Sequence, residues 1–428
     1  MASPAVWILD GVRSPFVKAG GAFRRTPVYE LGRVVIGELI ARSSLDPMRL
    51  DEVVLGNCGQ PPEAANVARV TALRAGIPEA VTSVTVHRNC ASGMESVADA
   101  SRRITSGEAK LVLAGGMESM SQMPVLYPLE YGEWLEKVAR AKTVPQRVAA
   151  FGAFRPALLR PRIGLAEGLT DPVCGLNMGQ TADLLAREFR IGREAQDAFA
   201  LRSHQLAVAA RERLREEIVP VFPPPACEAV RDDVGPRDGQ TLEALAKLRP
   251  YFDRRDGTVT VGNACQVTDG AVALLVGDGA TASKWPVPPL GRIRAFAFAG
   301  LSPARMGLGP VFAMAKALDR AGLTLADMER IEINEAFAAQ VLACMEASRS
   351  DAFAKAELGR DQALGEIPID KLNVNGGAIA LGHPVGASGA RLILTLLMEL
   401  RRRGLRRGMA ALCVGGGQGA AFVLERDA

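Results

Sequence analysis

One plan, a helix that leads into a glycine-ended strand, occurs twice in this chain and constrains its fold more than any other sequence feature. In the first copy, Cys90-Ala91-Ser92-Gly93 opens a helical stretch that leads to the strand-like residues 111–116. In the second copy, residues 386–389 (GASG) open a helical stretch that leads to residues 411–417. Two copies of one plan predict two similar domains packed together. The alternative is chance similarity between two small-residue turns.

Short apolar runs alternate with helical periodicity along the rest of the chain. We expect strands near residues 5–9, 52–55, 110–113 and 271–276. This α/β pattern predicts a mainly parallel sheet that is covered on both faces, and a length of 428 residues fits two or three structural units. Residues 120–250 are richer in Pro, Arg and long helices, and they are interpreted as an inserted lid that includes one surface helix over residues 193–218.

Composition excludes several functional classes. The formal net charge of +4 is too small to indicate nucleic-acid binding. The seven cysteines are far apart, with no CxxC pair and no Cys/His cluster, which argues against a metal site and against a disulfide framework. The N-terminus shows no targeting peptide, and no run of about 18 apolar residues predicts a membrane span. The expected location is therefore cytoplasmic.

Two residues stand where reactive side chains are expected. Cys90 precedes a helical stretch, whose positive end can lower a thiol pKa from about 8.5, although most cysteines are buried and inert. His383 lies in a glycine-rich turn, where backbone approaches a ligand closely. The other two histidines have ordinary interpretations: His87 packs at a strand end, and His204 lies on the surface helix.

Two further segments could complete such a site. The glycines after Cys413, beginning with Gly415, could leave backbone N–H groups free to bind an oxyanion; their spacing does not fit a dinucleotide-binding motif, and a Walker A motif is absent. Asn334 follows a strand-like run and could hold a water molecule or polarise a carbonyl group. Capping the next helix is the commoner reason for Asn at such a junction.

At these positions the chain resembles the thiolase family, and the resemblance covers nearly its whole length. The motifs that carry it are NCASGMES at Cys90, GGMESMS at residue 115, NMGQTAD at Asn177, LAKLRPYFD at residue 245, DGTVTVGNA at residue 256, NEAFA at Asn334, GGAIALGHPVGASGAR at residue 376 and CVGGGQGA at Cys413. The resemblance implies two layered βαβαβαββ core domains with an inserted loop domain. The implied boundaries are 1–120 and 251–285 for the first core, 121–250 for the inserted CoA-binding loop domain and 286–428 for the second core.

The resemblance also implies roles for named residues. Cys90 would carry the acyl group, His383 would take its proton, and Cys413 would exchange a proton with the acetyl-CoA carbanion. One oxyanion hole would comprise His383 and a water held by Asn334, and the other the N–H groups of Cys90 and Gly415. Coenzyme A would be a co-substrate, with no permanently bound cofactor and no metal. Its contacts would be Arg237, Met178, Ala264, Cys265 and Phe337.

Some positions depart from the family pattern. Ala244 and Cys265 replace two serines that contact pantetheine in short-chain biosynthetic members, and Asn177 replaces a histidine, so the CoA pose and the acyl pocket are expected to differ. Residues 133–162, with seven basic and two acidic residues, resemble the extended loop of the thiolase subunit of fatty-acid oxidation complexes. Such complexes usually have His in place of Asn334, which favours a stand-alone enzyme.

The resemblance implies thiolytic cleavage of 3-ketoacyl-CoA in fatty-acid beta-oxidation, by a homodimer or homotetramer. Residues 133–162 could contact a membrane surface or a hydratase/dehydrogenase partner subunit, or form a solvated lid that attracts CoA. An acetyl-CoA acetyltransferase and a non-catalytic acyl-CoA or lipid carrier are the alternative functions. A ketosynthase is disfavoured because the chain lacks a second motif histidine.

Overall fold

The computed structural model describes residues 5–427, and a large mixed sheet runs through it with strand order β10-β11-β12-β9-β1-β8-β5-β3-β4. Parallel pairing joins β3 to β4, β3 to β5 and β10 to β11. The pairs that connect the two halves, β5–β8, β8–β1, β1–β9 and β9–β12, are antiparallel. The prediction of a mainly parallel sheet is therefore wrong, because each half closes with antiparallel strands around β1.

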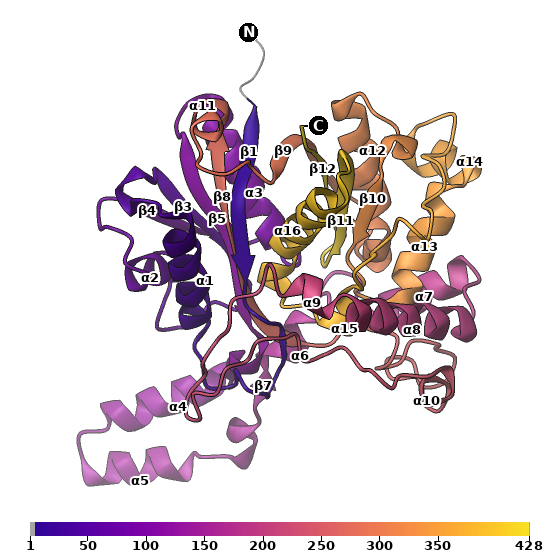
Figure 1. Cartoon of the computed structure of the whole chain (residues 1–428). Helices are drawn as coiled ribbons and strands as arrows, with labels where there is room; N and C mark the ends of the chain where they lie inside the picture. The colour runs from indigo at the N-terminus through magenta and orange to yellow at the C-terminus, as the bar shows by residue number, and fades with distance from the viewer. Residues whose placement is uncertain (1–4, 428) are drawn as a thin grey trace.

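Helices and strands alternate along the chain as expected (Figure 1). The strands of the main sheet are β1 (Val6–Arg13), β2 (Val17–Lys18), β3 (Glu52–Gly56), β4 (Thr82–Val86), β5 (Leu111–Ser119), β8 (Thr268–Asp278), β9 (Gly291–Gly300), β10 (Arg330–Ile333), β11 (Arg407–Val414) and β12 (Gln418–Glu425). The α-helices outside the inserted segment are α1 (Val28–Ser43), α2 (Val67–Arg74), α3 (Ser92–Ser106), α11 (Gly279–Ser283), α12 (Gly309–Ala321), α13 (Ala338–Ser348), α14 (Asp351–Phe353), α15 (Ala378–Leu381) and α16 (Val385–Arg403).

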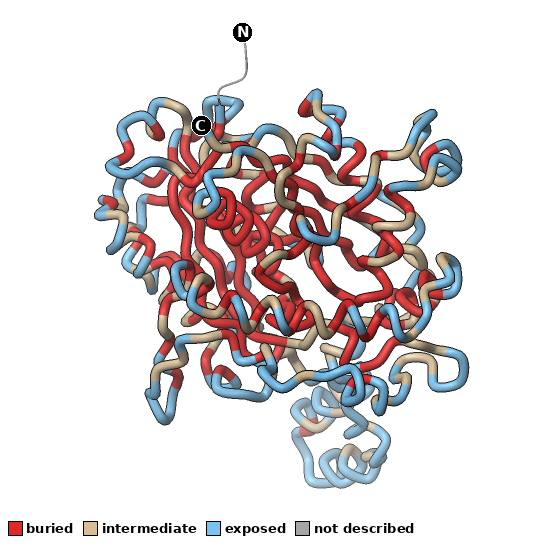
Figure 2. Tube along the Cα trace, turned by 45° about the vertical axis from the view of Figure 1, so that its right-hand side comes forward, coloured by how far each residue is buried: buried red, intermediate tan, exposed pale blue. Residues whose placement is uncertain are grey.

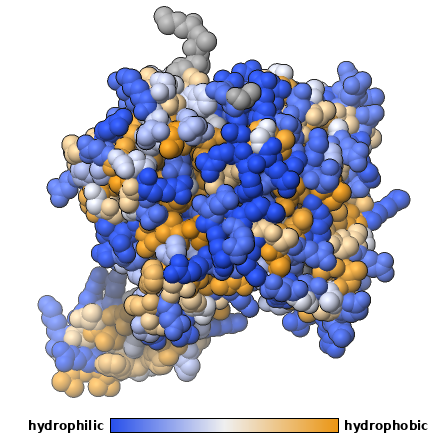
Figure 3. Space-filling model, in the orientation of Figure 1, coloured by the Kyte–Doolittle hydropathy of each residue, from blue (hydrophilic) through white to orange (hydrophobic). Residues whose placement is uncertain are grey.

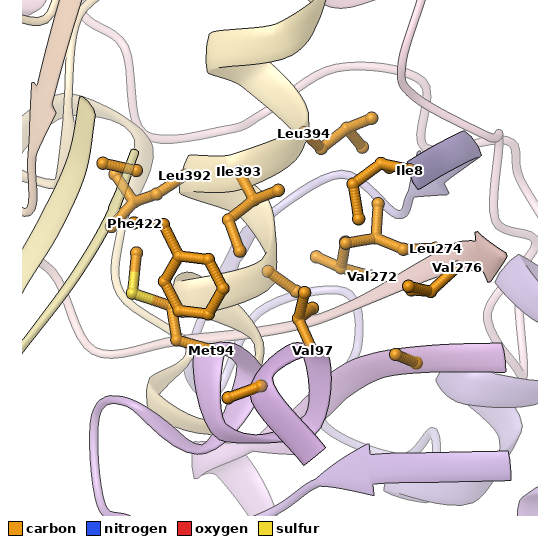
Figure 4. Close-up of a cluster of buried hydrophobic side chains, with 14 of the residues drawn as sticks. Ile8, Met94, Val97, Val272, Leu274, Val276, Leu392, Ile393, Leu394 and Phe422 are labelled. Atoms are coloured by element: carbon orange, nitrogen blue, oxygen red, sulfur yellow. The ribbon is translucent and has the colours of Figure 1, made fainter. Parts of the chain in front are cut away.

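Both faces of the sheet are buried, as the alternation of side chains along single strands shows. In β8, Val272 and Leu274 pack in the central core with α3 and α16, whereas Ala273 and Leu275 pack with α1 and α2 on the opposite face (Figure 4). Strand β11 repeats this pattern between the central core and α12 and α13. The result is a layered α/β fold of the thiolase type, with α3 and α16 in the middle layer.

The two middle helices correspond to the two copies of the repeated sequence plan. A Cβ on Gly93 of α3 would lie 2.7 Å from the backbone nitrogen of Ala390, and one on Gly389 of α16 would lie 2.5 Å from that of Met94. Glycine at both positions therefore lets the helix backbones touch. This contact brings the start of α3, after Cys90, next to the start of α16, after His383.

Between β5 and β8 the chain leaves the main sheet. This segment contains the two-stranded sheet of β6 (Val125–Leu126) and β7 (Arg162–Ile163), with α4 (Leu129–Arg140), α5 (Val144–Gly152), α6 (Gly164–Gly168), α7 (Met178–Glu188), α8 (Arg193–Ala209), α9 (Arg211–Leu214) and α10 (Leu242–Ala246). Residues 125–163, which we call the arm, protrude from the body (Figures 1 and 2). The residue boundaries of the predicted domains stay a prediction.

Two details of this segment differ from the sequence interpretation. The helix expected over residues 193–218 is divided into α8, which ends at Ala209, and the short α9. It does not reach residue 218, because Glu217 and Val219 pair with the backbone of Arg13 in β1. His204 is buried in α8 rather than exposed on a surface helix. Among residues 5–427, no helix is long and apolar enough to cross a membrane.

Candidate active site

The Cys90 loop connects β4 to α3 in a tight turn. Asn89 has a φ of +43°, and the Ser92 hydroxyl donates to the Asn89 carbonyl oxygen (2.7 Å) while it accepts from the N–H of Arg88 (2.9 Å). The Asn89 side chain then donates to the carbonyl oxygen of Gly415 (2.7 Å). This bond attaches the Cys90 loop to the glycine turn after β11.

The thiol of Cys90 is held in its protonated form. Burial raises its pKa above the ordinary value, while backbone hydrogen bonds from Gly415 and from Cys90 itself lower it only partly. The expectation that the helix end lowers this pKa is therefore wrong for the free protein, because loss of solvent outweighs the backbone donors. A thiol in this state needs a base to become a nucleophile.

His383 lies on the turn into α16, where its backbone N–H donates to the carbonyl oxygen of Gln266 (3.0 Å). Gly382, with a φ of +102°, makes the turn that carries it. Burial, and secondarily the charge of Arg391, lowers the pKa of His383 to about 3. The imidazole is therefore neutral at physiological pH and can accept a proton.

Ser388 determines which nitrogen of His383 is free. Its hydroxyl lies 2.6 Å from His383 Nδ1 and donates to the Pro384 carbonyl oxygen at 3.0 Å. A hydroxyl has one proton, so it accepts from Nδ1–H and leaves Nε2 as the basic nitrogen. Nε2 is buried and has no hydrogen-bond partner among the described residues.

Asn334 follows β10 with its side chain fully buried. Neither its Oδ1 nor its Nδ2 has a hydrogen-bond partner within residues 5–427, although buried amides are nearly always paired. It does not cap a helix, because α13 begins at Ala338 with Phe337 at the N-cap position. The Asn334 amide and His383 Nε2 are thus two unpaired buried groups, which suit a bound polar molecule.

The second cysteine, Cys413, is buried near the end of β11. Burial raises its pKa well above the ordinary value, and the charge of Cys90 raises it further. Burial and Cys90 likewise raise the pKa of Cys265 to about 12. Cys413 therefore lies within electrostatic range of Cys90 and, like Cys265, is protonated at neutral pH.

The predicted CoA contacts divide into two groups. Met178, Ala264 and Phe337 pack with Cys413 in one apolar cluster, and the Cys265 N–H donates to the Ala336 carbonyl oxygen (2.9 Å) beside it. Arg237 is exposed outside this cluster, and its backbone N–H donates to His204 Nδ1 (3.3 Å). The structure therefore gathers four of the five predicted contacts with the reactive residues and leaves Arg237 at the surface.

A cavity of about 760 Å³ opens beside Cys90. It lies at the base of the arm, and its lining residues from that side are mostly apolar: Met120, Met123, Pro124, Leu126, Leu165, Leu169, Pro172 and Val173. Asn89, Met178 and Gly415 line it from the body. His87 also lines it and is exposed, so its interpretation as a packing residue is wrong.

Sequence reasoning missed three residues here. Cys58 lines the same cavity, and its thiol donates to the Asn89 carbonyl oxygen (3.1 Å). Ser388 lies five residues after His383 in one motif, and Glu118 lies in the GGMES motif, so both had a sequence signal. Cys58 had none, because it is one of several isolated cysteines. No group of metal-ligating side chains occurs in the described part of the chain.

Comparisons with known proteins find thiolases along nearly the whole chain. The family model "Thiolase, N-terminal domain" matches residues 6–279, and "Thiolase, C-terminal domain" matches residues 287–426. A 3-ketoacyl-CoA thiolase of Yersinia enterocolitica is 41% identical over 98% of this chain and 96% of its own, and one of Yersinia pestis is 42% identical with the same coverage.

Solved structures give the same result. A Bacillus anthracis acetyl-CoA acetyltransferase superposes with a TM-score of 0.86 at 37% identity and covers 99% of both chains. Human mitochondrial 3-ketoacyl-CoA thiolase in complex with CoA superposes with a TM-score of 0.85 at 34% identity, over 99% of this chain and 98% of its own.

Proposed function

Because the chain belongs to the thiolase family, we propose that Cys90, His383, Cys413, Asn334 and Gly415 form its catalytic site. The chain is an enzyme, an acetyl-CoA C-acyltransferase that cleaves 3-ketoacyl-CoA into acetyl-CoA and a shortened acyl-CoA. Coenzyme A is its co-substrate. We assign each step of this reaction to a residue of the site.

In the first half-reaction, His383 Nε2 takes the proton of Cys90, and the thiolate attacks the ketone carbon. The bond between C2 and C3 then breaks, and Cys413 protonates the C2 carbanion, which leaves as acetyl-CoA. In the second half-reaction, the thiol of CoA gives its proton to the Cys413 thiolate and attacks the acyl group on Cys90. The Cys90 thiolate leaves and regains its proton from His383, and the shortened acyl-CoA is released. The neutral His383 and the protonated thiol of Cys413 have the protonation states that these steps require.

The observation that carries this assignment is the pair of unpaired buried groups, Asn334 and His383 Nε2. We assign them, with a water held by Asn334, to the thioester oxygen of the departing enolate. The N–H groups of Cys90 and Gly415, which already point at the Cys90 sulfur, are assigned to the oxyanion of the tetrahedral intermediate. Met178, Ala264, Cys265 and Phe337 are assigned to CoA, with Arg237 as an outer contact.

The cavity beside Cys90 supports medium or long acyl chains as substrates. Its volume lies within the usual range for ligand pockets, and its apolar side chains match an alkyl chain better than a two-carbon group. We therefore place the enzyme in fatty-acid beta-oxidation. Acetyl-CoA acetyltransferase activity is the second candidate, since one solved relative has that name.

Thiolysis of 3-ketoacyl-CoA substrates from four to sixteen carbons tests this proposal. Loss of the magnesium-enolate absorbance should be faster for longer chains and absent in Cys90→Ala. Cleavage of acetoacetyl-CoA alone would replace the chain-length assignment by the acetyltransferase alternative. Full activity in Cys90→Ala would refute the nucleophile, and no turnover of any substrate would favour the carrier alternative.

We also propose a contact surface, the arm. Half of the large exposed hydrophobic side chains among residues 5–427 lie on it, including Val144, Val148 and Phe151, and Figure 3 shows orange patches there. Basic residues flank them. We assign the arm to the surface of an anionic membrane, with a hydratase/dehydrogenase partner subunit as the alternative. We also propose that the protein is a cytoplasmic homodimer or homotetramer that does not bind nucleic acid.

A further inference from the structure

We propose that Glu118 is a positioning residue that holds the Cys90 loop and the His383 loop in register; this inference rests on the catalytic roles proposed above. Glu118 lies at the end of β5 and is fully buried. It contacts neither the acyl-transfer groups themselves nor, within residues 5–427, any cationic side chain. Its importance comes from the two segments that it joins.

The carboxylate accepts four hydrogen bonds from these segments. One oxygen accepts from the N–H of Gly59 (2.9 Å) and from the side chain of Asn57 (3.2 Å). The other accepts from the N–H of Cys58 (3.0 Å) and from that of Gly386 (2.9 Å). Burial raises the pKa of Glu118, whereas the N–H groups of Gly59, Cys58 and Gly386 lower it. Because each oxygen faces only donors, we take the group as ionised, so that it acts purely as an acceptor.

One donor segment is hydrogen-bonded to the Cys90 loop, and the other follows His383 in the chain. Cys58 donates its thiol proton to the Asn89 carbonyl oxygen, one residue before Cys90. Gly386 lies in the first turn of α16, three residues after His383 and two before Ser388, which orients the imidazole. A Cβ on Gly386 would lie 2.8 Å from a Glu118 carboxylate oxygen, so no side chain can intervene.

The same charge acts on the nucleophile. After burial, Glu118 contributes to the raised pKa of Cys90, and it also raises the pKa of Cys58. Other ionisable groups around Cys90 are the thiols of Cys58, Cys265 and Cys413, which are coupled to its charge. Those that line the same cavity are His87, Glu167 and Asp171. Glu118 therefore both fixes the distance between the two loops and disfavours the thiolate before substrate binds.

Two substitutions separate these effects. Glu118→Gln removes the charge and one acceptor, so the apparent pKa of Cys90 should fall by about one pH unit. Glu118→Asp keeps the charge but is too short to reach both segments, so this pKa should stay unchanged. In both variants kcat should fall about 100-fold with little change in KM, because misplaced reacting groups cost roughly this factor.

Alkylation of Cys90 by iodoacetamide, followed by mass spectrometry across pH, measures the thiol pKa without requiring turnover, with exposed Cys227 as the internal reference. Glu425→Gln is the matched control, since Glu425 is a buried carboxylate that pairs with Arg292 and Arg407 at the end of β12 opposite to the glycine turn after β11. It should lower the melting temperature and leave both kcat and the Cys90 pKa unchanged.

Wild-type kcat in Glu118→Gln would overturn the proposal. So would an equal loss of kcat in Glu425→Gln at the same melting temperature, because the effect would then be one of general stability. Identical Cys90 pKa values in all variants would show that the charge of Glu118 does not raise the pKa of this thiol. These results differ from failure of the catalytic assignment, which activity in Cys90→Ala would reveal.

Discussion

At the scale of single residues, the direction of one hydroxyl proton decides whether His383 is a usable base. Ser388 accepts from Nδ1–H because its own proton goes to Pro384. Without this partner, the imidazole would rotate or exchange tautomers, and Nε2 would be basic in only part of the molecules. Hydrogen bonds within this one turn therefore prepare the first proton transfer.

We expect Ser388→Ala to reduce kcat about 10- to 100-fold, the range found when general-base catalysis is partly lost. Steady-state thiolysis measures this change. Ser96→Ala is the control: Ser96 is equally buried and bonds to the carbonyl oxygens of Gly93 and Gly115, without contact to His383. Equal activity in Ser388→Ala and wild type would show that the imidazole needs no such support.

Two buried histidines predict how stability depends on pH. Burial, followed by the charge of Arg237, lowers the pKa of His204 to about 4, and burial lowers that of His383 to about 3. Both values are below the ordinary 6.5, so the unfolded chain binds more protons in acid. Their contribution to stability is therefore complete above about pH 6.5 and is lost progressively as pH falls towards 4.

Melting temperatures at pH 7.5 and pH 5.0 test this dependence. His204→Gln cannot take up the proton, so its decrease between the two pH values should be roughly 2 °C smaller than that of the wild type. The absolute stability of the variant does not affect this difference. An identical decrease in both proteins would mean that folding does not lower the pKa of His204.

At the scale of elements, the contact between α3 and α16 aligns the two reactive loops. Gly93→Ala would place a methyl group 2.7 Å from the backbone nitrogen of Ala390 and 3.0 Å from the carbonyl oxygen of Gly386. Backbone cannot move aside as a side chain can, so we expect a loss of about 1 to 3 kcal/mol in unfolding free energy, together with lower kcat. Urea unfolding and thiolysis measure the two effects.

Gly37→Ala is the matched control, because Gly37 is a helical glycine of α1 with open space around its Cβ position. Alanine there should stabilise the protein by about 0.5 to 1 kcal/mol and leave kcat unchanged. If Gly93→Ala were also stabilising, the helices would have room to separate, and close contact would not be what aligns the loops.

The element scale also shows what the sequence could predict. Alternation of apolar residues located β1, β3, β5 and β8 to within a few residues. It could not predict their direction, because a strand buried on both faces has the same composition in parallel and antiparallel pairs. The absence of helix at residues 217–218 was equally hidden, since it depends on pairing between Glu217 and the distant Arg13.

The candidate site likewise has features that the sequence could predict and features that it could not. Cys90, His383, Cys413 and Asn334 occur in motifs with recognisable local chemistry, so all four could be proposed from the sequence. The raised pKa of Cys90 could not be foreseen, because it depends on burial by segments that are remote in the chain. The bonds of Glu118 to Gly386 likewise join residues that no local pattern connects.

At the scale of the whole molecule, the arm is unlike the rest of the surface. Helices α4 and α5 contain no buried residue. Aromatic contacts among Tyr131, Trp134, Phe151 and Phe154 hold them together, with a hydrogen bond from Trp134 Nε1 to the Ala150 carbonyl oxygen (2.9 Å). Two short strands, β6 and β7, attach this unit to the body. The cavity beside Cys90 opens at this attachment, where Leu126 of β6 lines it.

A surface with exposed apolar side chains between basic ones predicts binding to anionic bilayers. We expect the protein to cosediment with vesicles that contain phosphatidylglycerol and to remain in solution with pure phosphatidylcholine, since apolar insertion and charge attraction are both needed. Val148→Ser with Phe151→Ser should reduce binding about tenfold or more and leave thiolysis in solution unchanged. Val287→Ser with Ile369→Ser, at comparably exposed apolar positions on the body, is the control and should bind normally. Equal binding by both double variants would place the contact elsewhere, and no binding by the wild type would leave the partner subunit as the occupant of the arm.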